Sequence, residues 1–396
     1  MLKHEDNSRK CPYPQSSLCK GARFTGCFKR YENVYCDGYQ MSWSKDGDLF
    51  VCYNDGVIDG VRVQAGREPG NRFTKGLAIP NQVETFTSGS ALVSGDDPFN
   101  LKFSPCTPLV YKSPRFHSLQ ATGVLHYNGV CYIGLNYWHR WVNYRNVTVN
   151  GENGPFAGFN ISMDNGKTWR MSPYDDQKPF FPEFGRPAKK DSLIRFGWPH
   201  FVDFGRNMEH SPDGLAYLSC SGTDDPEGVS VWDGGDAVWL CRVKPSPETI
   251  NDLSAYEFFA GLTSAGEPIW NKDFVSSKPI MRWPGHCGYA SIVYDPALKR
   301  YLAIMDAGNE HLDIAYDQWL AESENIWGPW RRVECFKAMG PLAYWTVLPS
   351  KFISKDGSRF VICYSVWTCG EGRDGLPPKQ LSHDYGLNVA EIELLM

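Results

Sequence analysis

Five hairpin signals recur along this chain, and their spacing constrains the fold more than any other feature. Each signal is an apolar run, a turn that contains glycine or proline, and a second apolar run. The turns lie near residues 47, 129, 214, 298 and 357, so the first four are just over 80 residues apart. A repeat of this length indicates supersecondary units that bury their apolar faces against one another.

Between successive hairpins the sequence leaves room for a second pair of strands, as in residues 156–172 after the second hairpin. Four strands per unit and five units in a ring describe a five-bladed β-propeller, which leaves only short sheet edges. Residues 388–396 follow the last hairpin alone, so we expect them to share a blade with an N-terminal strand such as residues 23–31. The predicted fold is all-β: an N-terminal extension over residues 1–19, then a single propeller of four-stranded blades over residues 20–396, closed by its N- and C-terminal strands.

Composition agrees with this fold class and argues against other functions. The 396 residues include 38 Gly and 27 Pro, and 14% are aromatic, which is typical of short strands joined by tight turns. The formal net charge of -5 and the lack of a Lys/Arg run give no basic surface for nucleic acid or an anionic membrane. We therefore expect a monomer with no nucleic-acid partner and no membrane partner.

The cellular compartment has two interpretations. The N-terminus shows no apolar segment of signal-peptide length, so the chain as written is expected in the cytoplasm with reduced thiols. Its 13 cysteines are an odd number and lie mostly inside apolar runs, where a free thiol behaves as a small hydrophobe. The sequons at Asn146 and Asn160 would also suit a secreted or periplasmic protein whose signal has been removed.

One turn motif supports the fold rather than the chemistry. The segment Ser162–Trp169 fits the pattern S-x-D-x-G-x-T-W, which resembles the Asp-box turn of sialidases and related propellers. We expect the Asp164 side chain to bond turn amides and Trp169 to pack into the blade, so the motif says little about catalysis.

The first hairpin carries two aspartates that could do chemistry. Asp37 and Asp55 each lie nine residues from Asp46 at the turn, so a regular hairpin would bring them together at its open end. Like charges placed opposite are destabilising unless something uses them, and paired carboxylates are typical of glycosidic bond cleavage. The alternative is structural, because Asp-Gly is a common turn dipeptide and both aspartates precede glycine.

The same mirror rule brings further candidates to the open ends of the other hairpins, where the mouth of a propeller channel would lie. It places His117 opposite His139, and Asp203 opposite Asp224. Asp203 is the third predicted catalytic residue, which would tune the pKa of the carboxylate pair. The predicted substrate-binding residues are His117, His139, His200, Arg206, Asn207, His286, Tyr344 and Trp345.

Each of these candidates also has a structural alternative. A histidine on a strand can be a hydrogen-bonded core residue, Arg206 can simply pair with Asp203, and Trp345 can belong to the core. In the functional interpretation, Tyr344, Trp345 and the other rim aromatics would form stacking walls for sugar rings.

Several segments together carry a resemblance to a known family: GARFTGCFKRY, YCDGYQMSWSKDGDLFVCYNDG, FGWPHFVDFGRNMEHSPDGLAYL, LSAYEFFAGLTSAGEPIW, WGPW and PSKFISKDG. Over roughly residues 20–395 the chain resembles a large bacterial propeller family that includes the endo-D-arabinanases that cleave mycobacterial arabinan. The resemblance implies a carbohydrate substrate and catalytic roles for the two aspartates of the first hairpin, here Asp37 and Asp55. His117 and His139 depart from the pattern of that family.

The leading functional prediction is therefore a glycoside hydrolase that acts on a poly- or oligosaccharide. Asp37 and Asp55 would be the acid and the base or nucleophile, with Asp203 as modulator. A separation of about 5 Å between the two carboxyl groups would mean retention of configuration, and about 6.5–9.5 Å would mean inversion.

Two alternatives stay open. A polysaccharide lyase could use His117, His139, Tyr137 and Arg206 to remove a proton beside a uronate carboxylate. A non-catalytic glycan-binding propeller would keep the aromatic side chains and show no activity. The chain has no C-x-x-C or H-x-x-x-H spacing, so no cofactor is predicted, and a divalent ion held by rim carboxylates is left open.

Overall fold

The computed structural model describes residues 11–63, 86–107, 109–110, 118–139, 142–144, 147–149, 152–185, 192–228, 230–231, 234–307, 317–336, 343–366 and 386–396. Within these residues the chain forms 27 strands and no α-helix, which confirms the all-β prediction. The described helical turns are four short 3₁₀ helices: η2 (Arg206–Met208), η3 (Leu253–Ala255), η4 (Phe274–Ser276) and η5 (Ser350–Phe352).

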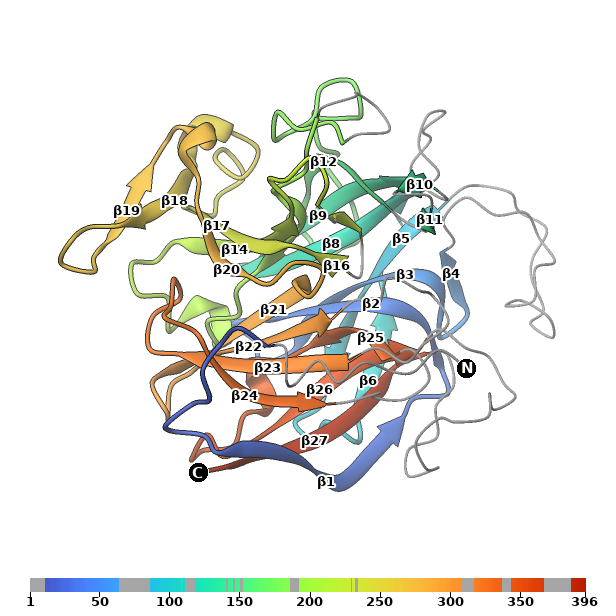
Figure 1. Ribbon diagram of the computed structural model, residues 1–396. Coiled ribbons are helices and arrows are strands. Elements are labelled where there is room, and N and C mark those ends of the chain that lie inside the picture. The colour runs from blue at the N-terminus through green and yellow to red at the C-terminus, as the bar shows by residue number, and fades with distance from the viewer. Residues whose placement is uncertain are drawn as a thin grey trace.

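Five antiparallel sheets follow one another in chain order around a central channel, and each is one blade of a propeller (Figure 1). The inner strand of each blade contacts the inner strand of the next, and the last contacts the first, so the ring is closed. This arrangement confirms the predicted five-bladed propeller. The inner strands of blades I to V are β2 (Val34–Trp43), β8 (Ser118–Tyr127), β13 (Gly197–Phe201), β21 (Gly288–Asp295) and β25 (Ala343–Val347).

The remaining strands complete the blades outward from the channel. Blade I adds β3 (Leu49–Ile58), β5 (Phe86–Ser94) and β6 (Lys102–Pro105), with β4 (Val61–Val63) paired to β3 and β7 (Leu109–Val110) paired to β5. Blade II adds β9 (Val130–His139), β12 (Glu152–Ser162), β15 (Ser230–Val231) and β16 (Gly234–Gly235), beside a separate hairpin of β10 (Val142–Tyr144) and β11 (Val147–Val149).

The last three blades follow the same plan. Blade III adds β14 (Ala216–Gly222), β17 (Ala237–Val243), β18 (Glu257–Leu262) and β19 (Pro268–Asn271), with β20 (Pro279–Arg282) paired to β17. Blade IV adds β22 (Arg300–Ala307), β23 (Asp317–Ser323) and β24 (Arg331–Phe336). Blade V adds β26 (Arg359–Val366), β27 (Asn388–Leu395) and β1 (Gly21–Arg30).

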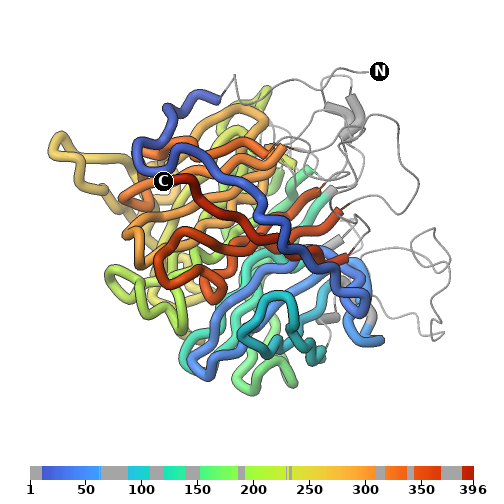
Figure 2. Tube along the Cα trace, turned by 90° about the horizontal axis from the view of Figure 1, so that it is seen from below, coloured from blue at the N-terminus to red at the C-terminus, as the bar shows by residue number. Residues whose placement is uncertain are grey.

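Blade V joins the two ends of the chain. β27 pairs with β1 from Gly21 opposite Leu395 to Arg30 opposite Asn388, and the two strands run side by side in Figure 2. This pairing confirms that the C-terminal strand shares a blade with the segment around residues 23–31. The ring is therefore fastened by hydrogen bonds between strands that are far apart in the sequence.

The segment before β1 also packs against the propeller. Gln15 forms a parallel bridge with Arg332 in β24 of blade IV. Ser16 Oγ donates a hydrogen bond to Glu322 Oε1 at 2.8 Å.

The connections between the first two strands of each blade all lie on one side of the ring, which we call the turn face. The opposite side, where the inner strands begin, we call the open face. The turn at Asn128 and Gly129 shows why these turns can be recognised in the sequence. Both residues have positive φ, 50° and 81°, which is the backbone conformation of a two-residue type I′ turn and favours Asn-Gly. The connections in blades I, II and IV are similarly compact, whereas residues 202–215 join β13 to β14, and residues 348–358, which include η5, join β25 to β26.

The turn that contains Asp164 ties blade II to blade I. The Asp164 carboxylate accepts hydrogen bonds from Thr168 N at 2.9 Å and Thr168 Oγ1 at 2.7 Å. Those bonds, with one from Ser162, lower the pKa of Asp164 to about 2. Trp169 Nε1 donates to Thr107 O of blade I at 3.2 Å, so the turn is part of the packing between blades.

Three further observations concern membrane-spanning helices, the thiols and one glycosylation sequon. None of the helices in the described part of the chain is long and apolar enough to cross a membrane. The 12 described cysteines are all free thiols. Asn160 is fully buried, and its Oδ1 accepts a hydrogen bond from Ser172 N at 2.8 Å, so this sequon cannot carry a glycan on the folded protein.

Candidate functional site

Each inner strand carries a β-bulge at the same level of the ring. The register against the second strand shifts between Asp37 and Gln40 in β2, and at the matching position in the other four blades. In four blades the residue inside the bulge has positive φ: 73° at Gly38, 46° at Trp198, 41° at Tyr289 and 53° at Trp345. Bulges re-aim side chains beside functional sites, and non-glycine residues at positive φ cost about 1–3 kcal/mol each.

The bulge residues of blades III, IV and V are aromatic and fill the channel. Trp345 stacks on Tyr289 with 5.4 Å between ring centroids and packs against Trp198 at 5.5 Å. All three are at most 3% exposed, and we call them the aromatic floor. At Gly38 of blade I, an added Cβ would lie 2.9 Å from the Trp345 ring, so only glycine leaves room for it.

The expectation that Tyr344 and Trp345 form stacking walls for sugar rings does not fit their burial. Trp345 and Tyr344 are 3% and 1% exposed, so neither offers an open ring face on which a sugar could stack. The backbone of Trp345 is instead held by Asp306 of blade IV, because the backbone N–H of Trp345 donates a hydrogen bond to Asp306 Oδ2 at 3.0 Å.

Asp37 and Asp55 lie on the open-face side of this floor, but they are not directly opposite one another. Asp37 pairs with Asn54 because the bulge between Asp37 and Gln40 adds one residue to β2, and a second bulge on β3, between Asn54 and Val57, restores the register. Asp55 lies in the second bulge and has a φ of 43°. The mirror rule assumes equal residue counts on both strands, and the bulge in β2 breaks that assumption, so the predicted Asp37–Asp55 pairing is wrong by one residue.

Each of the two carboxylates is held by a donor from a different neighbouring blade. Tyr344 Oη of blade V donates to Asp37 Oδ2 at 2.7 Å, and Gln120 Nε2 of blade II donates to Asp55 Oδ2 at 3.1 Å. Asp37 is buried, whereas Asp55 is only half-buried. Burial and the negative charge of Asp37 raise the pKa of Tyr344 well above its usual range, and Asp55 adds to the effect. The negative charges of both carboxylates therefore help to keep the Tyr344 phenol protonated.

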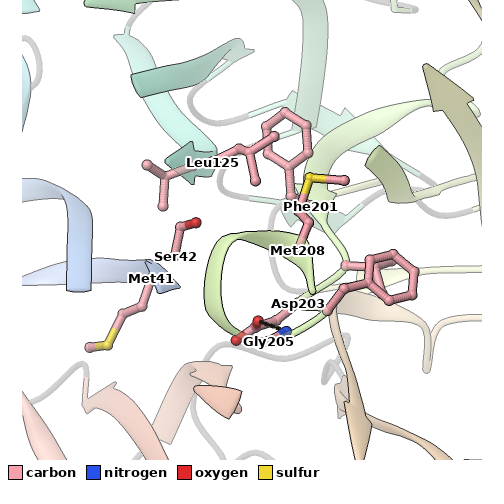
Figure 3. Close-up of a pocket in the computed structure, with 10 residues that line it drawn as sticks. Met41, Ser42, Leu125, Phe201, Asp203, Gly205 and Met208 are labelled. Atoms are coloured by element: carbon pink, nitrogen blue, oxygen red, sulfur yellow. Dashed lines mark hydrogen bonds between the residues drawn. The ribbon is translucent and has the colours of Figure 1, made fainter. Parts of the chain in front are cut away.

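The third predicted catalytic residue lies at the other end of the channel. Asp203 follows β13 on the turn face, where Ser350 Oγ donates to its Oδ1 at 2.7 Å and Ser350 N to its Oδ2 at 2.8 Å. Burial raises the pKa of the Asp203 carboxyl, and these hydrogen bonds oppose the rise. Figure 3 shows Asp203 beside a small hollow between blades I, II and III, lined by Met41, Ser42, Leu125, Phe201 and Met208.

The predicted position of Asp203 opposite Asp224 on the open face is wrong. The strand β13 ends at Phe201 and β14 begins at Ala216, so residues 202–215 form a loop rather than strand ends around a tight turn. Asp203 belongs to this loop, and Asp224 pairs instead with Arg282 at 2.8 Å. We call residues 202–215 the turn-face loop.

Arg206 and Asn207 lie in the turn-face loop as well and do not reach the open face. Arg206 Nε donates to Lys45 O at 2.9 Å rather than pairing with Asp203. Asn207 and Asn128 exchange two hydrogen bonds, Asn128 N to Asn207 Oδ1 at 2.8 Å and Asn207 Nδ2 to Asn128 Oδ1 at 3.0 Å. The predicted substrate-binding positions of Arg206 and Asn207 on the open face are therefore wrong.

The histidines divide between core and rim. His200 is 1% exposed inside the channel, with its ring 4.0 Å from that of Tyr289, and burial lowers its pKa to about 3. A neutral, enclosed imidazole fits the structural alternative. His286 lies at the open-face end of blade IV, where its ring stacks on Trp283 at 4.3 Å. His139 ends β9 opposite Glu152, and His117 lies outside the described residues.

Neither the lyase set nor a metal centre is assembled by the side chains that the structure describes. Arg206 is on the turn face, and Tyr137 is 3% exposed within the core of blade II. The described ranges contain no group of three or more His, Cys, Asp or Glu side chains that could hold a metal ion.

Two contacts of the site had no signal in the sequence. Gln120 and Asp306 contact Asp55 and the Trp345 backbone across blade boundaries, and hairpin patterning carries no information on which blades meet. The position of Asp306 itself agrees with the mirror rule for the fourth hairpin, because Asp306 pairs with Gly288, two residues after His286.

No protein-family model matches the sequence, and no curated protein matches it either. Solved structures do match over most of the chain. A proposed hydrolase from Bacteroides ovatus ATCC 8483 is 12% identical with a TM-score of 0.51, and the match covers 99% of this chain and 96% of that one. At this identity the likeness extends to the fold and not to the activity.

Two further solved structures resemble the chain more weakly. The GH43_1 enzyme from Xanthomonas citri is 11% identical with a TM-score of 0.47, covering 91% of this chain and 88% of its own. Zg3597, a family 117 glycoside hydrolase from Zobellia galactanivorans, is 10% identical with a TM-score of 0.46, covering 96% and 91%.

Proposed function

We propose that the protein is a glycoside hydrolase in which Asp37 and Asp55 are the acid and the base or nucleophile. One observation carries this proposal: two carboxylates from one hairpin lie on the open face, and each is held by a donor from a neighbouring blade. Cleavage of a glycosidic bond needs one carboxyl group to protonate the leaving oxygen and a second to activate water or attack the sugar. Two carboxylates that are both close enough to act on Tyr344 repel one another, and this repulsion lowers stability unless the pair has a use.

The surroundings of the pair suit this chemistry. The aromatic floor closes the channel beneath the carboxylates, since its three rings are at most 3% exposed. Substrate and water would therefore reach the aspartates from the open face. Asp37 is buried on the floor side, where the lower local dielectric strengthens its interaction with positive charge that develops on the sugar.

The substrate class proposed is a neutral poly- or oligosaccharide. Among the predicted substrate-binding residues, His286 has a half-buried ring at the open-face end of blade IV. Its place at the end of blade IV suits a contact to the glycan rather than to the reacting bond.

The reaction class can be tested with a substrate panel. The protein is incubated with arabinan, other neutral glycans and uronate polysaccharides, while reducing ends and the ultraviolet absorbance of unsaturated uronates are both followed. The proposal predicts new reducing ends from a neutral glycan without unsaturated product. An unsaturated uronate product would replace the hydrolase by a lyase, and tight glycan binding without cleavage of any substrate would support a binding module.

A further inference from the structure

The side chain of Asn54 joins blade I to blade II directly beside the candidate site. Its Nδ2 donates to Ala121 O at 2.9 Å, and its Oδ1 accepts from Ala121 N at 2.9 Å and from Ser88 Oγ at 2.6 Å. Asn54 is fully buried, so these bonds are shielded from water. One amide side chain therefore bonds both backbone groups of one residue, as a neighbouring antiparallel strand would. We call the two bonds to Ala121 the Asn54 clip.

The Asn54 clip lies one residue from the contact between Asp55 and Gln120. Asn54 precedes Asp55 in β3, and Ala121 follows Gln120 in β8. Because consecutive residues are linked by a planar peptide unit, with Cα atoms about 3.8 Å apart, the clip limits how far Asp55 can move from Gln120. The bond from Gln120 Nε2 to Asp55 Oδ2 is 3.1 Å long, near the upper end of the usual range, so a small separation of the two strands would break it.

The same side chain also contacts the other strand of the hairpin. Asn54 is the residue that pairs with Asp37 of β2. A Cβ added at Gly38 would lie 2.7 Å from Asn54 Nδ2, so the amide lies directly against Gly38. Asn54 thus connects both strands that carry the aspartates to the inner strand of blade II.

Related contacts occur at other boundaries between blades. In each, a side chain from the second strand of one blade bonds the backbone of the inner strand of the next: Ser219 Oγ to Ala290 O at 2.8 Å, Trp345 N to Asp306 Oδ2 at 3.0 Å, and Ser365 Oγ to Cys36 O at 3.3 Å. Bonds of this kind hold the ring together. The Asn54 clip has a further consequence, because it stands next to a candidate catalytic carboxylate.

We propose, resting on the hydrolase function above, that Asn54 is a positioning residue for Asp55. The Asn54 clip holds the Asp55 carboxylate at hydrogen-bonding distance from Gln120. Asp55 needs this placement whether it acts as the acid or as the base or nucleophile, because either role requires a fixed distance to the reacting atoms of the glycan.

The placement of Asp55 can be measured without any substrate. Carboxyl carbons of ¹³C-labelled aspartate are titrated by NMR, and the Asp55 resonance is assigned by its loss in Asp55→Asn. Gln120→Leu removes a donor from the carboxylate and should raise the Asp55 midpoint by about one pH unit. Asn54→Ala should raise the midpoint in the same direction. When Asn54→Ala is combined with Gln120→Leu, the midpoint should rise no further than in Gln120→Leu alone, because both changes act on one bond.

Two results would overturn the proposal. One is an unchanged Asp55 midpoint in folded Asn54→Ala. The other is a double variant whose shift equals the sum of the two single shifts, since Asn54 would then act on Asp55 independently of Gln120.

Asn251 offers a matched control. Its Nδ2 donates to Phe159 O at 2.7 Å and its Oδ1 accepts from Phe159 N at 2.8 Å, so it makes the same pair of bonds to β12, the third strand of blade II. Asn251→Ala should lower the melting temperature, as Asn54→Ala does, and leave the Asp55 midpoint in place. An equal shift of the midpoint in both variants would mean that it follows general loosening of the propeller, and the inference would fail. If Asn54→Ala does not fold by circular dichroism, Ser88→Ala removes the other donor to Asn54 Oδ1 and should raise the midpoint by a smaller amount.

Kinetics on a glycan that the parent cleaves separate positioning from stability. Asn54→Ala should lower kcat by about 10–100-fold with little change in KM, because a carboxylate is misplaced while the rest of the glycan site is intact. Asn251→Ala should keep the kcat of the parent, and equal kcat values for the two variants would contradict the inference. A shifted Asp55 midpoint in a protein that cleaves no glycan would instead defeat the hydrolase proposal and leave standing the role of Asn54 in placing Asp55.

Discussion

Gly38 is the residue on which the geometry of the site depends most closely. Its φ is 73°, and a Cβ there would lie 2.7 Å from Asn54 Nδ2 and 2.9 Å from the Trp345 ring. Asn54 is the partner of Asp37 in the hairpin, and Trp345 belongs to the aromatic floor. The glycine therefore lets the floor and the catalytic hairpin come into contact.

Substitution of this glycine should cost both backbone strain and space. Gly38→Ala is expected to lower the free energy of unfolding by about 2–5 kcal/mol, from positive φ together with overpacking. Gly60→Ala is the control, because Gly60 also has positive φ, 82°, but nothing lies within 4 Å of an added Cβ. It should cost only about 1–2 kcal/mol. Urea denaturation of both variants measures the difference, and equal losses would show that the close approach to Trp345 has no energetic weight.

For single residues, the sequence predicted which carboxylates lie at the site better than it predicted which residues contact them. Asp37 and Asp55 could be found because each lies nine residues from Asp46, in a turn that the sequence identifies. Their register could not, because a bulge has no reliable signature in alternating apolar residues. The contact of Asp37 with Tyr344 joins blades I and V across 307 positions of sequence, and no local pattern reports it.

Among the elements, the turn-face loop has a part that the sequence did not suggest. Asp203 N donates to Ile292 O at 2.9 Å on blade IV, and its side chain accepts from Ser350 beyond β25 of blade V. Arg206 reaches Lys45 of blade I, and Asn207 reaches Asn128 of blade II. One loop of blade III thus bonds all four other blades, so it stabilises the ring at the end remote from the carboxylates.

This arrangement predicts a loss of stability without a loss of chemistry. Asp203→Asn should lower the free energy of unfolding by about 1–3 kcal/mol, because a half-buried acceptor of two Ser350 bonds is weakened. The activity per folded molecule should stay close to that of the parent. Asp46→Asn, at an exposed turn on the same face, should change neither quantity. A large fall in kcat for Asp203→Asn, with unchanged melting, would return Asp203 to the catalytic set.

The Asp164 turn gives a prediction about pH. Its folded pKa is lowered from 3.8 to about 2, so the ionised form is favoured in the folded state. The resulting stability is present above about pH 4 and is lost as the pH falls toward 2. Between these values, the melting temperature of Asp164→Asn should fall less steeply than that of the parent. Parallel curves for the two proteins would contradict the assignment.

The element-scale misplacements have one cause. A hairpin centred on Asp213-Gly214 was expected to have strands of equal length on both sides, but β13 holds only five residues before the turn-face loop. Asp203, Arg206 and Asn207 were consequently assigned to the wrong end of the channel. Sequence alone does not distinguish a strand from a loop that carries apolar residues such as Phe204 and Met208 into the core.

For the whole molecule, the important contact is the pairing of β27 with β1 on one side and β26 on the other. Ala390 lies at its centre, opposite Phe28 and Ile362. The five-fold repeat of hairpins could be read directly from turn residues, so the architecture and its closure were predictable. The relative positions of the blades depend on packing between repeats, which local sequence patterns do not report. The contacts of the site that join different blades were therefore not predictable.

Interrupting the closing strand should destabilise the entire ring. Ala390→Pro removes a ladder hydrogen bond from a strand with partners on both sides, where proline is not tolerated. We expect a loss of at least about 1–3 kcal/mol and one cooperative transition at lower temperature. Met396→Pro lies beyond the strand and serves as the control. If Ala390→Pro melted as the parent does, closure by the terminal strands would not be a main source of stability.

The account as a whole depends on the two aspartates of the first hairpin. On a glycan that the parent cleaves, Asp37→Asn and Asp55→Asn should each lower kcat by about 10²–10⁴-fold or more, since each removes one member of the acid and base pair. Both variants should melt at or above the temperature of the parent, because one of two neighbouring like charges is gone. Asp46→Asn, in the turn of the same hairpin, should keep full activity. Parent-level activity in either Asp37→Asn or Asp55→Asn would contradict the proposed mechanism.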